Sequence, residues 1–397
     1  MKVRYAYRIY PTSPQQRALA RLFGCVRTVW NDSLALCRMS SKLPKTSALQ
    51  KLFITLAKKT QDRAWLKDVS AIPLQQSIND LGVAFKNFFS GLNKNRKIGY
   101  PKFKKRSNKQ SARFTKGVFS IKGDSVYLAK IGQLKTKWSR ELPSPPSSVT
   151  VIKDCANRYF LSFVVEIELI SKPTPKESIG ADLGIKIFAA LSNGEKIYAP
   201  CLKQLDRKIR CTQKQLARCI KGSNRRDKVR LKLAQLHAKL ADTRKDFLHK
   251  LSTRLVRDNK LVVLEDLAVS NMVKNRRLAR VISQQGWSMF RTMCQAKANQ
   301  YQDREVRVID RWQPTSQVCS SCGYKWGKLN LSVREVVCSG CKVSHCRDIN
   351  AAKVINNVGV GHIHDTKRTV SHSKTDLSAS CNETSTRKLD IVQLKLF

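Results

Sequence analysis

Acidic residues are scarce in this sequence, which has 28 Asp and Glu against 76 Lys and Arg and therefore a formal net charge of +48. Such an excess destabilises a compact fold by self-repulsion unless a polyanion neutralises it. The basic residues are spread over most of the 397 residues, which favours a protein that binds nucleic acid over a large surface. A solubility device or a membrane-surface binder is the alternative.

Long apolar runs are missing as well. The chain contains no run of about eighteen apolar residues, as a transmembrane helix requires, and its start, MKVRYAYRIYPTSPQQ, lacks the apolar stretch of a secretory signal. We therefore expect a cytoplasmic protein. Most of its 13 cysteines are scattered singly and are expected to be small core residues rather than disulfides.

Apolar periodicity divides the first half of the chain. Residues 3–10 alternate as a strand does, whereas residues 14–93 carry apolar side chains at helical spacing and predict an all-helical lobe. Residues 117–170 indicate short strands, which the early strand is expected to join in a small barrel. The two prolines of residues 171–178 indicate a linker.

A basic segment, residues 94–115, follows the helical part and carries Tyr100, Phe103 and Phe114 among its Lys and Arg. In nucleic-acid-binding segments, cations neutralise phosphates while rings stack on bases. The alternative is an exposed basic loop whose rings pack inward. The sequence leaves both interpretations open.

A second domain is predicted from about residue 179, where strands and helices alternate. The expected elements are, in chain order, a three-stranded meander in 179–200, two helices in 201–257 broken near 221–224, a buried strand at 260–267, a helix at 282–303, a strand at 304–310 and a closing helix at 347–357. The polar composition that follows predicts a disordered tail.

Four cysteines carry the strongest local signal. Cys319 and Cys322 form one C-x2-C pair, Cys338 and Cys341 form another, and fifteen residues separate the pairs. This spacing is typical of a site in which two knuckles supply four thiolates to one tetrahedral Zn²⁺. Four protein ligands leave no open position, so the predicted zinc is structural. The adjacent residues His345–Cys346 are substitute ligands that a complete set does not need.

Three acids occupy positions that call for an explanation. Asp182 lies in an apolar strand, Glu265 ends the strand LVVLE, and Asp348 opens the helix DINAA just after the second cysteine pair. A buried carboxylate is costly unless it is paired or binds a metal ion. If the strands are neighbours and the helix packs across their ends, the acids converge. They could then bind two Mg²⁺ or Mn²⁺ ions about 3.5 to 4 Å apart at a scissile phosphate.

The residues alone leave other interpretations open. Asp182 could cap a turn at Gly184, and Asp348 could be a helix N-cap. Glu265 or Asp266 could pair with an arginine.

Several longer segments extend these signals. They are YRIYPTSPQQ, LQQSINDLGVAFKNFF, GYPKFKK, GADLGIKIFAALSNGEKI, LVVLEDLAVSNMVKNRRLARVISQQGW and the cysteine pairs running into HCRDINAAKVI. In this order, and over about residues 1–356, the sequence resembles the TnpB family. Its members are transposon-encoded, RNA-guided DNA nucleases related to the type V CRISPR effectors.

The resemblance implies an α+β multidomain protein built around an RNase H-like (RuvC) α/β nuclease domain. The family's motifs place the catalytic, Mg-binding acids at Asp182, Glu265 and Asp348 and the zinc ligands at the four cysteines above. The implied parts are the first strand of a β-barrel wedge domain (1–13), a helical recognition lobe (14–93), the basic loop, remaining barrel and linker (94–178), the first part of RuvC (179–312), an inserted zinc ribbon (313–344), the last RuvC helix (345–358) and a polar tail (359–397).

The resemblance also implies an activity. Similar proteins bind a guide RNA from the transposon end, recognise a short motif beside the target, and cut double-stranded DNA at one RuvC site. We accordingly expect a Mg²⁺-dependent endonuclease, monomeric on its RNA and associated with a prokaryotic nucleoid. Gln75 and Thr115 match positions that touch the target-adjacent motif, although ordinary helix and loop roles would explain them equally well.

One residue departs from the family pattern. Relatives commonly read H-D-R-D where this chain has His345-Cys346-Arg347-Asp348. If that residue tunes the site, turnover is lower here or the copy has begun to decay.

Three alternative functions stay open: a cleavage-deficient RNA-guided regulator, a DNA-strand-joining transposase, and a structural RNA-binding factor.

Overall fold

The computed structural model describes residues 1–93, 98–173, 176–330 and 332–361. Parts of three predicted segments therefore lie outside the described residues: 94–97 of the basic segment, 174–175 of the linker, and the tail from residue 362 onward.

Contacts divide the chain into two compact units. The first is formed by residues 1–167 together with 214–235, and the second by residues 168–213 together with those from 236 onward. None of the helices among the described residues combines the length and the apolar composition needed to cross a bilayer.

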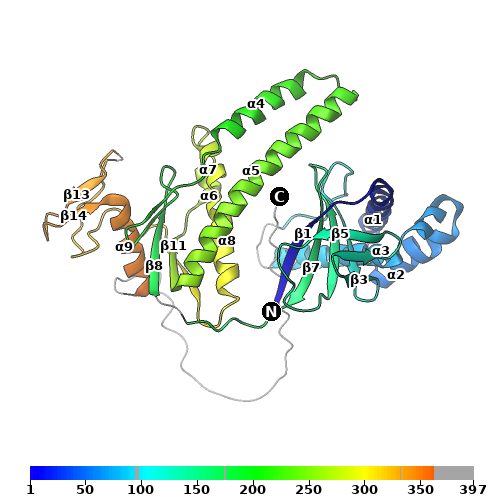
Figure 1. The fold of residues 1–397 in the computed structure, drawn as a ribbon, viewed down its shortest axis with the longest axis horizontal. Coiled ribbons are helices and arrows are strands. Elements are labelled where there is room, and N and C mark those ends of the chain that lie inside the picture. Colours follow the sequence, from blue (N-terminus) through cyan, green and yellow to red (C-terminus); the bar gives the residue numbers. More distant parts are fainter. Residues whose placement is uncertain (94–97, 174–175, 331, 362–397) are drawn as a thin grey trace, which may run out of the picture. The chain divides into compact units, whose positions relative to one another are not determined.

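A seven-stranded antiparallel sheet organises the first unit (Figure 1), with strand order β2-β6-β7-β1-β5-β4-β3. The alternating segment near the N-terminus lies inside it, because β1 pairs along its whole length with β7, with Tyr7 opposite Leu161. The sequence predicts a barrel here, and the hydrogen-bond ladders give a sheet that runs from β2 to β3. The strands are β1 (Lys2–Ile9), β2 (Gln110–Thr115), β3 (Phe119–Lys122), β4 (Ser125–Leu128), β5 (Gly132–Lys137), β6 (Ser148–Lys153) and β7 (Tyr159–Glu166).

The helices of the first unit pack against this sheet and against one another. The longest, α1, begins where the sequence PTSPQQ predicts, with the Thr12 amide donating to the Gln15 side chain and a proline in the first turn. Residues 51–56 form a π-helix, which is wound more loosely than an α-helix, and residues 57–59 and 61–68 form 3₁₀ helices, which are wound more tightly. The apolar spacing does not reveal this difference. The helices are α1 (Ser13–Met39), α2 (Thr46–Gln50), the π-helical η1 (Lys51–Leu56), the 3₁₀ helices η2 (Ala57–Lys59) and η3 (Gln61–Asp68), and α3 (Ala71–Asn93).

The three rings of the basic segment differ in exposure: Phe114 is buried, whereas Tyr100 and Phe103 stay more than a third exposed, at 37% and 41%. Phe114 is fully buried in β2, so the possibility that it stacks on a base is wrong. The Tyr100 ring meets Phe85 and Phe88 of α3 edge to face, with 5.3 Å between ring centroids in each pair. Lys104 lies with its ammonium 3.9 Å from the centre of the Trp30 ring. The described part of the loop is therefore anchored to the helices by its own side chains.

A five-stranded mixed sheet organises the second unit, with strand order β10-β9-β8-β11-β12. Strands β8, β11 and β12 are parallel, while β9 and β10 are the antiparallel arms of the predicted meander. β8 begins inside the predicted linker. The strands are β8 (Lys176–Leu183), β9 (Ala189–Leu191), β10 (Lys196–Ile197), β11 (Asn259–Glu265) and β12 (Glu305–Ile309), with a separate small ladder of β13 (Glu335–Val337) and β14 (Ser344–Cys346).

Helices cover both faces of this sheet (Figure 1). On one face, apolar residues of α5 and α8 join Ala181 and Leu264 in a core. On the other, α9 packs Val354, Ile355 and Val358 against Val263. The remaining helices are α4 (Lys203–Arg218), α5 (Asn224–Asp258), α6 (Val269–Met272), α7 (Ala279–Gln285), α8 (Trp287–Ala298) and α9 (Arg347–Val360). The end of α4 and the start of α5 fall within residues 214–235 and so belong to the first unit.

The single helix predicted at 282–303 is wrong. Gly286 adopts a left-handed conformation with φ 74° and separates α7 from α8. A β-carbon at this residue would also lie 3.1 Å from Leu248 of α5. The apolar spacing continues across the break, so periodicity alone does not reveal it.

Candidate metal centres

Two of the predicted acids end neighbouring strands. β8 and β11 are parallel, and Ala181 is the partner of Leu264. Asp182 and Glu265 are the next residues on their strands, so they stand side by side at the carboxyl edge of the sheet. Both project on the face that α9 covers, because side chains alternate along each strand and Val263, two residues before Glu265, packs against α9.

The third acid is brought to the same edge by α9. Asp348 lies in the first turn of this helix, whose N-cap is Cys346, so the interpretation of Asp348 as an N-cap is wrong. A β-carbon at Gly180 would lie 2.3 Å from the Ala352 carbonyl oxygen. Any residue with a β-carbon at position 180 would clash with α9, so Gly180 allows β8 and α9 to pack this closely. This close packing sets where the first turn of α9 lies.

Of the three carboxyl groups, Asp182 lies within reach of the charges of both others. Burial, followed by the charges of Glu265 and Asp348, raises the pKa of Asp182 to about 8. Burial also raises the pKa of Glu265. A 2.7 Å hydrogen bond from the Thr315 hydroxyl to Oε1 of Glu265 has the opposite, smaller effect. A divalent cation would relieve this repulsion, and oxygen-only ligands are those that Mg²⁺ and Mn²⁺ prefer. The donor set therefore fits such ions.

The neighbouring acid Asp266 has a different role. Its carboxylate accepts a 2.8 Å hydrogen bond from Arg291 and another from Arg311. These two guanidinium groups hold the pKa of Asp266 below its ordinary value. The alternative that one acid of this pair binds arginine is thus correct for Asp266, while Glu265 stays available as a ligand.

A cationic side chain missed in the sequence reaches the site. Arg334 lies 3.3 Å from Oδ1 and 3.4 Å from Oδ2 of Asp348. Its side chain is half exposed, at 51%. Arg334 precedes β13 in the segment between the cysteine pairs. Thr315 was missed too, since neither residue carries a spacing signal of its own.

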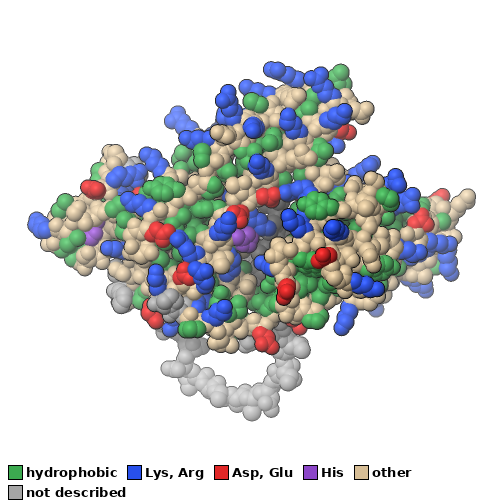
Figure 2. All heavy atoms as spheres, in the orientation of Figure 1, with side chains coloured by type: hydrophobic (Ala, Val, Ile, Leu, Met, Phe, Trp, Pro, Cys, Tyr) green, Lys and Arg blue, Asp and Glu red, His purple; other side chains and the backbone are tan. Residues whose placement is uncertain are grey.

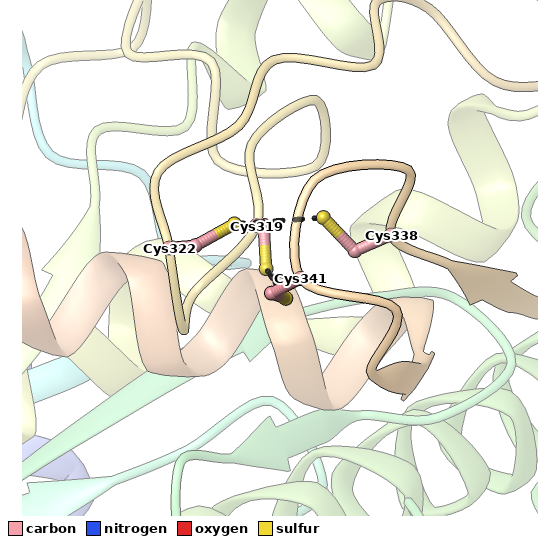
Figure 3. Close-up of side chains that lie close together, drawn as sticks. All are labelled: Cys319, Cys322, Cys338 and Cys341. Carbon is pink, nitrogen blue, oxygen red and sulfur yellow. Dashed lines mark hydrogen bonds between the residues drawn. The ribbon is translucent and has the colours of Figure 1, made fainter.

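The four predicted cysteines form one cluster. Their sulfurs lie within 4.8 Å of one another, as a metal ion requires, and among the described residues they are the one set of three or more His, Cys, Asp or Glu side chains that does so. Figure 3 shows the four side chains directed toward a common centre beside α9. Sγ···Sγ distances are 3.7 Å for Cys319–Cys341 and 3.5 Å for Cys322–Cys338. The carboxylate oxygens of Asp182, Glu265 and Asp348, in contrast, do not all lie within 4.8 Å of one another. Like charges are expected to stay apart in this way.

The residues considered as substitute ligands lie outside the cluster. His345 is buried, and its Nε2 is 3.2 Å from the Cys319 sulfur, so its ring contacts one ligand atom rather than replacing it. Cys346 is instead hydrogen-bonded to the Lys196 side chain.

A buried amide joins the cysteine cluster to α9. Asn350 is 1% exposed; its Oδ1 accepts from the Ser320 amide at 2.8 Å and its Nδ2 donates to the Val318 carbonyl at 2.7 Å. Asn350 follows Asp348 by two residues on the helix. The loop of the first cysteine pair is therefore hydrogen-bonded directly to the turn of helix that carries the third acid, which explains why the two motifs are adjacent in the sequence.

Gln75 and Thr115 lie in the first unit. Gln75 is half-buried on α3 and Thr115 is half-buried at the end of β2. The two elements are linked by an ion pair between Asp80 and Arg113, with 2.5 Å between nitrogen and oxygen. Their suggested contact with a target-adjacent motif stays a prediction.

Comparison with known proteins now places the chain. A protein of Streptomyces pristinaespiralis named "Putative RNA-guided DNA endonuclease" is 42% identical over 91% of this chain and 90% of its own length. The OrfB_IS605 profile, described as "Probable transposase", matches residues 162–276. The chain belongs to the TnpB family. The resemblance derived from the sequence is thereby confirmed.

Other matches agree with TnpB membership. The Escherichia coli K12 protein "Putative RNA-guided DNA endonuclease InsQ" is 30% identical over 90% of this chain and 92% of its own. A "Cas12f1-like, TNB domain" profile matches residues 287–355, which include the four cysteines. A "Helix-turn-helix domain" profile matches residues 1–42, where this TnpB protein has β1 and the long α1.

The fold also has a solved counterpart. The structure titled "Cryo-EM structure of the Cas12f1-sgRNA-target DNA complex" superposes with a TM-score of 0.53, at 14% identity, over 86% of this chain and 82% of the other. At that identity the match shows a shared fold. This TnpB protein is thus a mixed α/β protein of that architecture with a four-cysteine cluster that can hold a metal ion.

Proposed function

We propose that this protein is an RNA-guided DNA endonuclease of an insertion sequence. The observation that supports it most is the meeting of Asp182, Glu265 and Asp348 at one edge of the second sheet, where the Asp182 pKa responds to both other acids. The named relatives and the Cas12f1 fold agree with it. Its RNA and DNA partners also account for the charge of +48.

The second unit is proposed to be an RNase H-like (RuvC) domain. Its sheet has three parallel strands, with an antiparallel meander on the β8 side. The cysteine segment then lies between β12 and α9, as an insertion before the last acid. We propose that it holds one structural Zn²⁺, because four thiolates leave no open position.

The carboxylates are proposed to hold two divalent cations, Mg²⁺ or Mn²⁺. Ions held there would activate a water for attack on the scissile phosphorus and stabilise the departing 3′ oxygen. The protein's own groups prepare the site: Thr315 orients Glu265, and Arg334 holds Asp348. The half-exposed Arg334 is also proposed to donate to a phosphate oxygen.

Partner binding is proposed to use the basic surface. Figure 2 shows Lys and Arg side chains over much of the face in view, with few Asp and Glu among them. Such surfaces bind polyanions without regard to sequence, so base pairing with a guide would supply specificity.

The experiment that tests the proposal begins with the RNA that copurifies with the protein, which is sequenced to find the guide. The complex is then incubated with plasmids that match the guide and carry a randomised flank, with Mg²⁺ or with EDTA. Linear plasmid selected for one flank, in Mg²⁺ alone, supports the proposal. Guided binding without cutting identifies a regulator, and joined strands identify a transposase.

Replacing Arg334 with alanine is expected to slow DNA cleavage about 10- to 100-fold, the effect of losing one charged hydrogen-bond donor. Guide and target binding should stay unchanged, since Arg334 is one cation among 76. Single-turnover cleavage rates measure the effect. Lys325→Ala removes a charge from the same segment and serves as the control. Equal rates for Arg334→Ala and wild type would show that Arg334 only fills space beside Asp348.

A further inference from the structure

A lysine stands in the same row of the sheet as the acids. Asp182 on β8 is paired with Ala190 on β9, and Ala190 is paired with Lys196 on β10. Residues directly opposite one another in neighbouring strands project from the same face. Lys196 therefore projects on the carboxylate face, two strands from Asp182. At about 4.8 Å per strand, their backbones are about 10 Å apart.

Only the small, buried Ala190 separates Lys196 from Asp182 in this row. Lys196 itself is exposed, and its ammonium lies beside Cys346, the N-cap of the helix that carries Asp348. The acid next to it in sequence does not hold it back, because Glu195 forms an ion pair with Arg254 at 2.8 Å.

Lys196 is an exposed lysine and therefore a cation at neutral pH. The hydrogen bond with Cys346, followed by the charges of Cys346 and then Asp348, raises the pKa of Lys196 above its ordinary value. A cation is thus maintained at the side of the metal-binding acids, on a strand that contributes no acid of its own. Because Lys196 stands to one side of the acids, a phosphate that it binds would flank the scissile phosphate in the same strand.

We propose that Lys196 binds the phosphate next to the scissile one in the strand being cut, and that this contact sets the line along which the strand crosses β10, β9 and β8. The inference rests on the proposed nuclease function and extends it to the path of the substrate. Lys196 would be a binding and positioning residue, because it lies on β10, which carries none of the three carboxylates.

The competing explanation is that Lys196 acts only through Cys346 and Asp348. The two differ in their dependence on one phosphate. A neutral methylphosphonate at a single position removes that phosphate's charge and leaves the others. If Lys196 binds it, the substitution and the Lys196→Ala variant remove the same interaction, so their effects on the rate are not additive.

The test measures single-turnover cleavage by the protein–guide RNA complex on target strands with one methylphosphonate at successive positions around the cut. Wild type is expected to be slowed about tenfold by one position flanking the cut, the size of one charged hydrogen bond. Lys196→Ala should be slowed about tenfold on the natural strand and no further at that position. Lys196→Arg should restore most of the rate.

Lys260→Ala is the matched control. Lys260 is an exposed lysine of the same unit, paired with Glu177 at 3.8 Å. It lies near the start of β11, whereas the acid Glu265 lies at the end of that strand. This variant should behave as wild type at every position.

Three results decide the inference. A natural-strand rate unchanged in Lys196→Ala overturns it. A slower rate with the wild-type methylphosphonate profile also overturns it, because Lys196 then acts through its neighbours. If wild type does not cut at all, the proposed function fails, and binding still tests Lys196: the slope of log affinity against log salt for the target strand should fall by about 0.7 in Lys196→Ala. An unchanged slope overturns the contact.

Discussion

Replacing Asp182 with alanine is expected to abolish target cleavage, with a fall in rate of at least about a thousandfold. The variant removes the carboxylate on which the charges of both other acids act, and with it several kcal/mol of charge stabilisation at the scissile phosphate. Binding of guide RNA and of target DNA should be unchanged, because both depend on the basic surface. Cleavage rates and filter-binding affinities of the same preparation measure the two effects.

The control for this variant is Asp246→Ala, which removes an aspartate from α5 whose ion pair with Lys250 is largely exposed. It should cut at the wild-type rate. Undiminished cleavage by Asp182→Ala would refute the assignment of the site. A parallel loss of RNA binding would show instead that the variant fails to fold, and Asp182→Asn, which keeps the volume, would then decide.

Replacing Cys338 with serine is expected to release the metal and unfold the segment around residues 319–341. A four-thiolate zinc site contributes about 10 to 16 kcal/mol of apparent binding energy in small zinc peptides. Because Asn350 links the loop of the first cysteine pair to α9, the placement of Asp348 should loosen and cleavage should fall as well. Metal analysis and amide hydrogen exchange measure the two local effects.

Cys211→Ser provides the matched control, since Cys211 is a single exposed cysteine on α4. It should keep a full equivalent of zinc and wild-type exchange. An unchanged metal content in Cys338→Ser would contradict the four-thiolate site and would point to His345, which lies beside the Cys319 sulfur, as a replacement ligand.

Much of the candidate site could be predicted because it depends on strand ends and short spacings. A strand that ends in an acid directs that acid to the sheet edge, so Asp182 and Glu265 follow from two apolar strands being neighbours. The cysteine cluster follows from two C-x2-C pairs. Both signals come from residues close together in the sequence. Each then needs one contact between distant segments, which is the pairing of β8 with β11 for the acids and the approach of the two C-x2-C pairs for the cysteines.

The features that were missed depend on tertiary contacts. Arg334 reaches Asp348 because a loop folds back onto α9, and Asn350 acts only once the cysteine loop lies against it. Phe114 resembles a base-stacking ring in a basic segment, yet alternation in β2 directs it into the core. At Gly286 the chain breaks a helix without interrupting the apolar spacing. Such features depend on what packs against them, which the sequence does not display.

The most direct test of the central claim is to locate divalent cations in crystals of the protein–RNA complex soaked in Mn²⁺, using anomalous scattering. We expect peaks contacted by the carboxylates of Asp182, Glu265 and Asp348, and no such peaks in crystals of the Asp182→Ala variant. Ordered carboxylates without a peak between them, in crystals where Mn²⁺ binds elsewhere, would contradict the claim that these acids form a metal-dependent nuclease site.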